Sequence, residues 1–217
     1  MWDLRYQGAR KIKNGRIDTG DPDNGPRVPP GTYTVKLSAG GKTLTAPLKV
    51  MPDPRGDLSQ TDLEAQASFA VRVRDDISKL SDLVNQLRSV QEQLKARNSA
   101  LASRKADAGV ADLIGESEAA IKKAFAIEDK LHNPTAEVVY DILAMRGGAR
   151  LYSRLSPLQM WALESSGAPT AGMTQVLAEQ EKELAALESE TKGFLSGDVA
   201  KINKGATQLN LPFVIIK

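Results

Sequence analysis

Few residues of this chain have the chemistry of a catalytic group. The 217 residues include one histidine, His132, and no cysteine. This excludes a disulfide framework, a thiolate metal site, a cysteine nucleophile and any site that needs two imidazoles. His132 lies at the end of a predicted helix, just before Asn133-Pro134, where the helix dipole favours a positive side chain. We therefore interpret His132 as a helix-end residue and not as a general base.

Pairs of acidic residues are the other candidates for acid–base chemistry. They are Asp75-Asp76, Glu181 with Glu183, and Glu188 with Glu190. Glycoside hydrolysis needs two carboxyl groups that face each other across a pocket. These pairs instead lie on predicted helix faces, where charged side chains are normally solvated. The sequence therefore indicates no catalytic residue, and we expect the chain not to be an enzyme.

Two short motifs invite comparison with ligand-binding loops. The segment Asp21-Pro22-Asp23-Asn24-Gly25 begins like a calcium loop, but an EF-hand has glycine at the sixth position and a distal glutamate. Here glycine is fifth and the glutamate is missing, so we interpret the segment as an ordinary turn. Gly147-Gly148 lacks the following Lys-Ser or Lys-Thr of a phosphate-binding loop. We predict no metal site and no cofactor.

Charge is distributed unevenly along the chain. Residues 1–56 contain ten basic and five acidic residues, whereas residues 57–217 contain nineteen and twenty-two. The basic part includes Arg10, Lys11, Lys13 and Arg16. Nucleic-acid surfaces interleave such charges with stacking aromatic residues, and none occurs here. We therefore interpret this segment as a solvated loop that balances an acidic neighbour, and we expect no nucleic-acid binding.

The first 55 residues have the pattern of strands and loops. Trp2, Leu4 and Tyr6 alternate with polar residues, which is typical of a half-buried strand. A long irregular connection follows over residues 7–30. Residues 32–50 alternate again on either side of Ala39-Gly40-Gly41, which predicts a hairpin. We expect residues 2–6 to form a third strand, in a thin sheet whose edges are open.

The remainder of the chain has helical periodicity. Residues 51–56 form a proline-rich connector. Apolar residues then recur every three or four positions along a helix from about 59 to 100, capped by Ser59 or Thr61. Further helices are predicted over 110–132, from 134 or 135 to 145, over 151–163 with a start at Ser156-Pro157, and from Thr170 to about 194. The first helix is longer than its partners, so we expect its distal end to protrude.

These elements predict an α+β fold. A small antiparallel β segment occupies residues 1–55, and an antiparallel helical bundle occupies residues 56–217. No run of 18 apolar residues occurs, and residues 1–30 lack the apolar core of a signal peptide. We expect a protein partner, or self-association, through the helix stripes and the open sheet edge.

Several motifs resemble the C-terminal region of bacterial sortilin-like (VPS10-type) β-propeller proteins, which are often labelled BNR-repeat glycosyl hydrolases. The motifs are Trp2-Asp3-Leu4-Arg5-Tyr6, Pro30-Gly31-Thr32-Tyr33-Thr34-Val35, Gly41-Lys42-Thr43, Asp53-Pro54-Arg55, Asn133-Pro134 and Ala168-Pro169-Thr170. In that family a propeller precedes an immunoglobulin-like sandwich, similar to that of hook-capping proteins, and a helical bundle closes the chain. The resemblance therefore implies an incomplete immunoglobulin-like segment followed by a bundle, and export of the parent protein.

The resemblance carries no functional residue over to this chain. The propeller is absent, no Ser-x-Asp-x-Gly-x-x-Trp box occurs, and the first strands of the sandwich are missing. A strand that begins at the first residue suggests a chain cut from a longer one. We expect a non-catalytic accessory segment that acts in packing, spacing or protein association. The alternatives are a free-standing coiled-coil-like adaptor that binds a partner helix, and a glycoside hydrolase whose activity belongs to the missing propeller.

Overall fold

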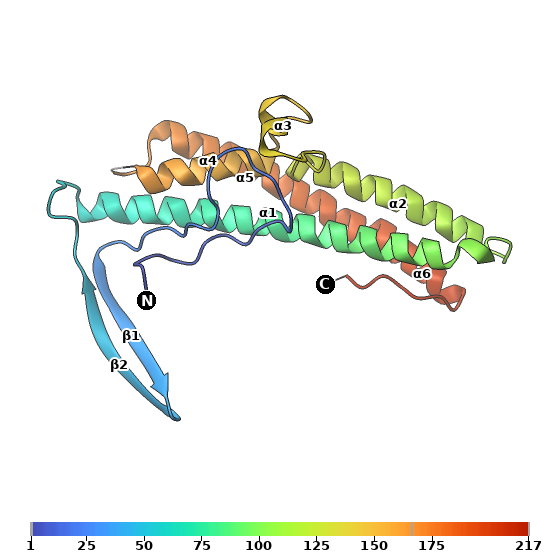
Figure 1. The fold of residues 1–217 in the computed structure, drawn as a ribbon, viewed down its shortest axis with the longest axis horizontal. Helices are drawn as coiled ribbons and strands as arrows, with labels where there is room; N and C mark the ends of the chain where they lie inside the picture. Colours follow the sequence, from blue (N-terminus) through green and yellow to red (C-terminus); the bar gives the residue numbers. More distant parts are fainter. Residues whose placement is uncertain (1, 166, 217) are drawn as a thin grey trace.

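The structure is a computed structural model, and it describes residues 2–165 and 167–216. The predicted α+β class is confirmed: a two-stranded antiparallel sheet projects from an elongated helical bundle (Figure 1). In chain order the elements are β1 (Gly31–Ala39), β2 (Lys42–Val50), α1 (Gln60–Ala100), η1 (Ala102–Arg104), α2 (Val110–Leu131), α3 (Val139–Leu143), α4 (Leu151–Glu164), α5 (Ala171–Phe194), η2 (Leu195–Val199) and α6 (Ala200–Gln208).

The predicted hairpin is present as β1 and β2. Gly40 and Gly41 have φ angles of 55° and 74°, and two successive positive φ angles make the type I′ turn that suits a two-residue hairpin loop. The register places Leu37 opposite Leu44. Because directly opposed residues share a face of the sheet, the alternation produces one apolar face and one polar face.

The predicted third strand over residues 2–6 is wrong. This segment makes one isolated antiparallel bridge, between Arg5 and Arg27, and the sheet contains only β1 and β2 among the described residues. Leu4 has a φ of 63°, which is outside the strand region. The three prolines between residues 26 and 30 also lack the N–H groups that a continuing ladder would require.

Helix α1 is the central element of the bundle. Its N-cap is Ser59, whose hydroxyl accepts a hydrogen bond from the Asp62 backbone N–H at 3.1 Å. The predicted apolar stripe is buried against the other helices. Its fully buried members are Val73, Ile77, Leu80, Val84, Leu87 and Leu94.

The distal end of α1 does not protrude, so that prediction is wrong. Helix α4 packs along the first half of α1 and α2 along the second half (Figure 1). The C-terminal tail also returns to α1, where the Gln93 side chain exchanges two hydrogen bonds with the Ile215 backbone, at 2.8 and 2.9 Å. Two shorter helices placed end to end therefore cover the one long helix.

Two other helix boundaries differ from the prediction. Helix α3 is limited to five residues. The Asn133 amide donates to the backbone oxygens of Arg146 and Gly148, and these bonds close residues 133–148 into a loop. Helix α4 begins at Leu151 and contains Pro157. The predicted start at Ser156-Pro157 is therefore wrong. The prediction of Thr170 as a cap is confirmed by a 3.2 Å bond from the Met173 N–H.

The segment before the hairpin is irregular but packs on the bundle. Ala9 and Ile12 belong to the same apolar core as the stripe of α1. Gly20, with a φ of 94°, lies so close to α4 that an added Cβ would be 2.3 Å from Ser156 Oγ. Residues 7–28 therefore form a strap across the helices, hereafter the N-terminal strap.

Candidate functional site

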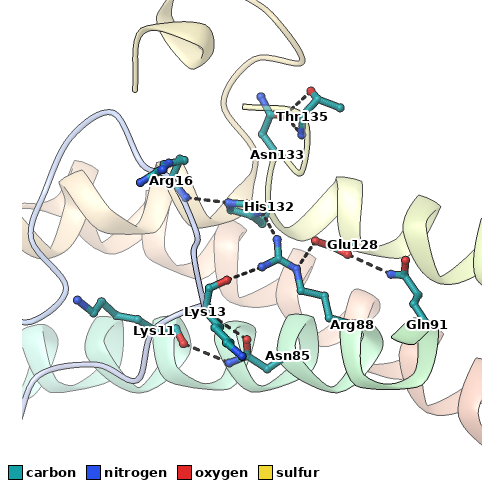
Figure 2. A network of polar contacts seen from close by, with 10 residues as sticks. All are labelled: Lys11, Lys13, Arg16, Asn85, Arg88, Gln91, Glu128, His132, Asn133 and Thr135. Carbon is teal, nitrogen blue, oxygen red and sulfur yellow. Dashed lines mark hydrogen bonds and ion pairs between the residues drawn. The ribbon is translucent and has the colours of Figure 1, made fainter. Parts of the chain in front are cut away.

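A buried ion pair joins α1 to α2 beneath the N-terminal strap. Arg88 Nε is 2.7 Å from Glu128 Oε1, and Gln91 donates to Glu128 Oε2 at 3.1 Å (Figure 2). The Glu128 residue is 3% exposed. A carboxylate at such a depth requires a cation and hydrogen-bond donors, and both are supplied here by α1.

The same polar cluster fastens the N-terminal strap. Arg88 Nη1 donates to the Lys13 backbone oxygen at 2.6 Å, and the Arg16 backbone N–H donates to His132 Nε2 at 3.1 Å (Figure 2). Asn85 accepts from the Lys13 backbone N–H at 3.1 Å and donates to the Lys11 oxygen at 3.2 Å. These bonds satisfy backbone groups that an irregular segment could not pair by itself.

His132 is buried and neutral, in contrast to the positive helix-end residue that we predicted. Burial, with the positive charge of Arg88 adding to it, lowers the pKa of His132 to about 4. The two ring nitrogens face the Arg16 N–H and, at 3.5 Å, Arg88 Nη2. Both neighbours are donors, so the charged imidazole would have no acceptor here. The contacts of His132 therefore suit an anchor for the strap and leave no free lone pair for a substrate proton.

The acidic pairs are used mainly for contacts between helices. Glu181 binds Arg72, Glu183 binds Arg154 and Glu190 binds Lys130, all at 2.6–2.7 Å. The prediction of solvated helix faces is thus too simple. These ion pairs join neighbouring helices at the rim of the bundle, where each adds about 1 kcal/mol or less to the free energy of unfolding.

Asp76 is the exception among the acidic residues. Burial in the first place, and the nearby Glu181 carboxylate in the second, raise the pKa of Asp76 to about 6. Its Oδ2 is buried without a hydrogen-bond partner among the described residues. Asp76 is therefore a carboxyl group that titrates close to neutral pH at the boundary of α1 and α5.

Two of the basic strap residues, Arg10 and Lys11, form ion pairs with acidic neighbours. Arg10 makes a bidentate pair with Asp82 of α1, from Nε to Oδ1 and from Nη2 to Oδ2, and Lys11 pairs with Asp23. Asp21 accepts from the Asp23 N–H at 3.2 Å and from Asn24 at 3.1 Å, as in an ordinary turn. The described residues contain no group of three acidic or histidine side chains that could hold a metal ion.

An open hollow of about 460 Å³ lies inside the strap, with Tyr152 of α4 among its lining residues. Burial raises the pKa of Tyr152, so its hydroxyl stays protonated at neutral pH. Asp21 and Asp23 also line the hollow, but both carboxylates are already used by the turn and by Lys11. The hollow therefore does not present two free acids that converge on a substrate.

The hairpin is the more distinctive surface. It extends away from the helices (Figure 1), and every residue of β1 and β2 except Tyr33 and Val50 is exposed. Leu37 and Leu44 are 62% and 69% exposed. The stripe of α1 is buried within the chain, so of the two surfaces predicted for association the sheet is the one that remains available.

The sequence did not reveal a second apolar surface, around α3. Its exposed side chains include Tyr140 at 75% and Met145 at 79%. We predicted a short helix here, from 134 or 135 to 145. The available signal was the bracketing of this short run by Asn133-Pro134 and Gly147-Gly148, which marks an excursion between helices.

Comparison with protein-family models, with curated proteins and with solved structures finds no match for this chain. No helix of the described residues is both long and apolar enough to span a bilayer.

Proposed function

We propose that this chain is a non-catalytic association module, in which the helical bundle is a spacer and the β1–β2 hairpin docks on a β-sheet of a protein partner. The observation that carries the proposal is the exposed apolar face of the hairpin, formed by Val35, Leu37, Leu44 and Leu48. A two-stranded hairpin is marginally stable in water unless it packs on something else. Covering its apolar face contributes about 25 cal/mol per Å² of apolar surface.

The resemblance to sortilin-like proteins suggests a specific form for the partner. We propose that the hairpin completes an immunoglobulin-like β-sandwich, whose other strands belong to the propeller-bearing part of such a protein. In a sandwich, two sheets pack face to face about 10 Å apart through alternating apolar residues. The alternation of β1 and β2 fits this arrangement, and any glycoside hydrolase activity would then belong to the propeller.

The test is a binding experiment between this chain and the propeller-bearing part of a sortilin-like protein, ended after the first strands of its immunoglobulin-like sandwich. We expect light scattering to give the mass of a 1:1 complex, which is lost with Leu37→Asp and retained with the control Thr45→Asp on the polar face. Absence of a complex would refute the proposal. A mass of the chain alone that rises with concentration would favour the adaptor alternative.

Catalysis is tested separately. We expect no turnover of sialosides or aryl glycosides by this chain. Turnover that survives purification and disappears when one carboxylate is substituted would show that the chain is an enzyme after all.

A further inference from the structure

The two edges of the hairpin are not equivalent. With a two-residue turn, the closing pair Ala39 and Lys42 is hydrogen-bonded, and hydrogen-bonded and non-hydrogen-bonded pairs then alternate along the ladder. Thr34 and Pro47 consequently form a non-hydrogen-bonded pair, at which backbone groups point away from the partner strand. The missing N–H of Pro47 therefore falls on the outer edge of β2.

The outer edge of β2 is protected against strand addition. Pro47 removes a donor near its middle, and Lys42 and Lys49 lie towards its two ends. Proline and lysine are the residues by which edge strands avoid pairing with other chains. The outer edge of β1 contains no proline over its nine residues and has Lys36 as its single charge. Its outward N–H and C=O groups belong to Thr32, Thr34, Lys36 and Ser38.

We infer that the outer edge of β1 is the site at which a partner adds a β-strand, and that this strand alternates apolar with acidic residues. This inference rests on the proposed function and names the partner element. Residues of an added strand that lie opposite Tyr33, Val35 and Leu37 lie on the apolar face of the hairpin, so they should be apolar. Those opposite Thr34 and Lys36 lie on the polar face, beside a lysine.

Charge selects the acidic strand over a second copy of this chain. Residues 28–52 contain three lysines and no acidic residue. Full-length antiparallel addition of another β1 would place Lys36 opposite Thr34 and diagonal to the Lys36 of the other chain, and addition of β2 would be opposed by its proline. An acidic strand removes both obstacles and complements the lysines, because opposite charges on facing strands stabilise a pair and like charges destabilise it.

The probe is a capped nine-residue peptide with valine or leucine at odd positions and glutamate or threonine at even positions. We expect saturable binding to the full chain, with NMR shifts concentrated at the amides of 32–38 and weakening as salt is raised. A peptide with lysine in place of glutamate should bind at least about tenfold more weakly, because each glutamate contact is replaced by a like-charge one.

Matched proline variants test the edge itself. Thr34→Pro removes an outward donor of β1, and Thr45→Pro makes the same change on the outer edge of β2. We expect Thr34→Pro to weaken binding by about tenfold or more and Thr45→Pro to leave it within about twofold. Equal losses from the two variants, equal binding of the two peptides, or no binding by the unmodified chain would overturn the inference.

A second measurement leaves the protein unchanged. N-methylation of the peptide on the residues whose N–H groups face β1 should abolish binding, whereas methylation of the alternate residues should not. Equal effects of the two methylations would contradict strand addition. If the sandwich complex forms but the acidic peptide does not bind, the edge inference fails while the proposed docking of the apolar face stands.

Discussion

The free energy of unfolding should depend on pH through two titratable groups with shifted pKa values, His132 and Asp76. His132 should give the larger change. Its pKa is about 4 in the folded chain, against 6.5 for a free imidazole. The unfolded chain therefore binds more protons between these values, and the contribution of neutral His132 is complete above pH 6.5 and is lost as the pH falls towards 4. The difference between the two pKa values corresponds to roughly 3 kcal/mol.

Asp76 acts in the opposite direction over nearly the same range. Its pKa is about 6 in the folded chain, against 3.8 for a free carboxyl group. The folded chain binds this proton more tightly, so lowering the pH from 6 towards 4 increases stability. After allowance for solvent screening of a half-buried carboxylate, the gain is roughly 1–2 kcal/mol.

The assay is urea unfolding followed by circular dichroism at pH 7, 6, 5 and 4.5. The unmodified chain should lose about 1–2 kcal/mol over this range, because the two effects partly cancel. The Asp76→Asn variant should lose more stability than the unmodified chain, up to about 3 kcal/mol in total over this range. The His132→Gln variant should instead become more stable as the pH falls. Three parallel profiles would refute the reasoning, since carboxylates common to all three proteins cancel in the comparison.

Three further predictions concern the bundle and the hairpin. Glu128→Gln should lower the free energy of unfolding in urea by about 2–4 kcal/mol, because it leaves Arg88 without its partner. Glu190→Gln, in an exposed pair, should lower it by less than about 1 kcal/mol. Similar losses would show that burial does not determine the strength of these pairs. Leu87→Ala should cost about 2–5 kcal/mol, and Leu44→Ala on the hairpin should stay within about 0.5 kcal/mol, as judged by thermal unfolding. Backbone amide hydrogen exchange should be much faster in β1 and β2 than around Leu80 of α1. Equal protection would show that the hairpin is as stable as the bundle.

The local elements were predictable because their signals are local. The Gly40-Gly41 turn with alternating neighbours determines the hairpin, and a stripe at spacings of three and four residues determines α1. The same alternation over residues 2–6 failed to predict structure, because the φ of Leu4 and the prolines of the opposing segment decide the pairing. Periodicity alone does not record whether a partner strand can donate hydrogen bonds.

The relations between distant segments were not predictable in this way. The length of α1 followed from its sequence, but the end-to-end placement of α2 and α4 along it did not. The state of His132 depends on Arg88 and on the backbone of Arg16, which is 116 residues away in the chain. Likewise, the raised pKa of Asp76 depends on Glu181, from another helix.

The attachment of the hairpin to the bundle has a mechanical consequence. Both of its strands return to the same place, where the Gln60 side chain at the start of α1 donates to the Pro30 oxygen at 2.8 Å. A partner bound to the hairpin, as we propose, would therefore be joined to the bundle by two chain segments instead of a single linker, which would restrict its rotation about the attachment point. Helix α1 has 41 residues, about 60 Å at 1.5 Å per residue, so the orientation of such a partner would fix the position of the far end of the bundle.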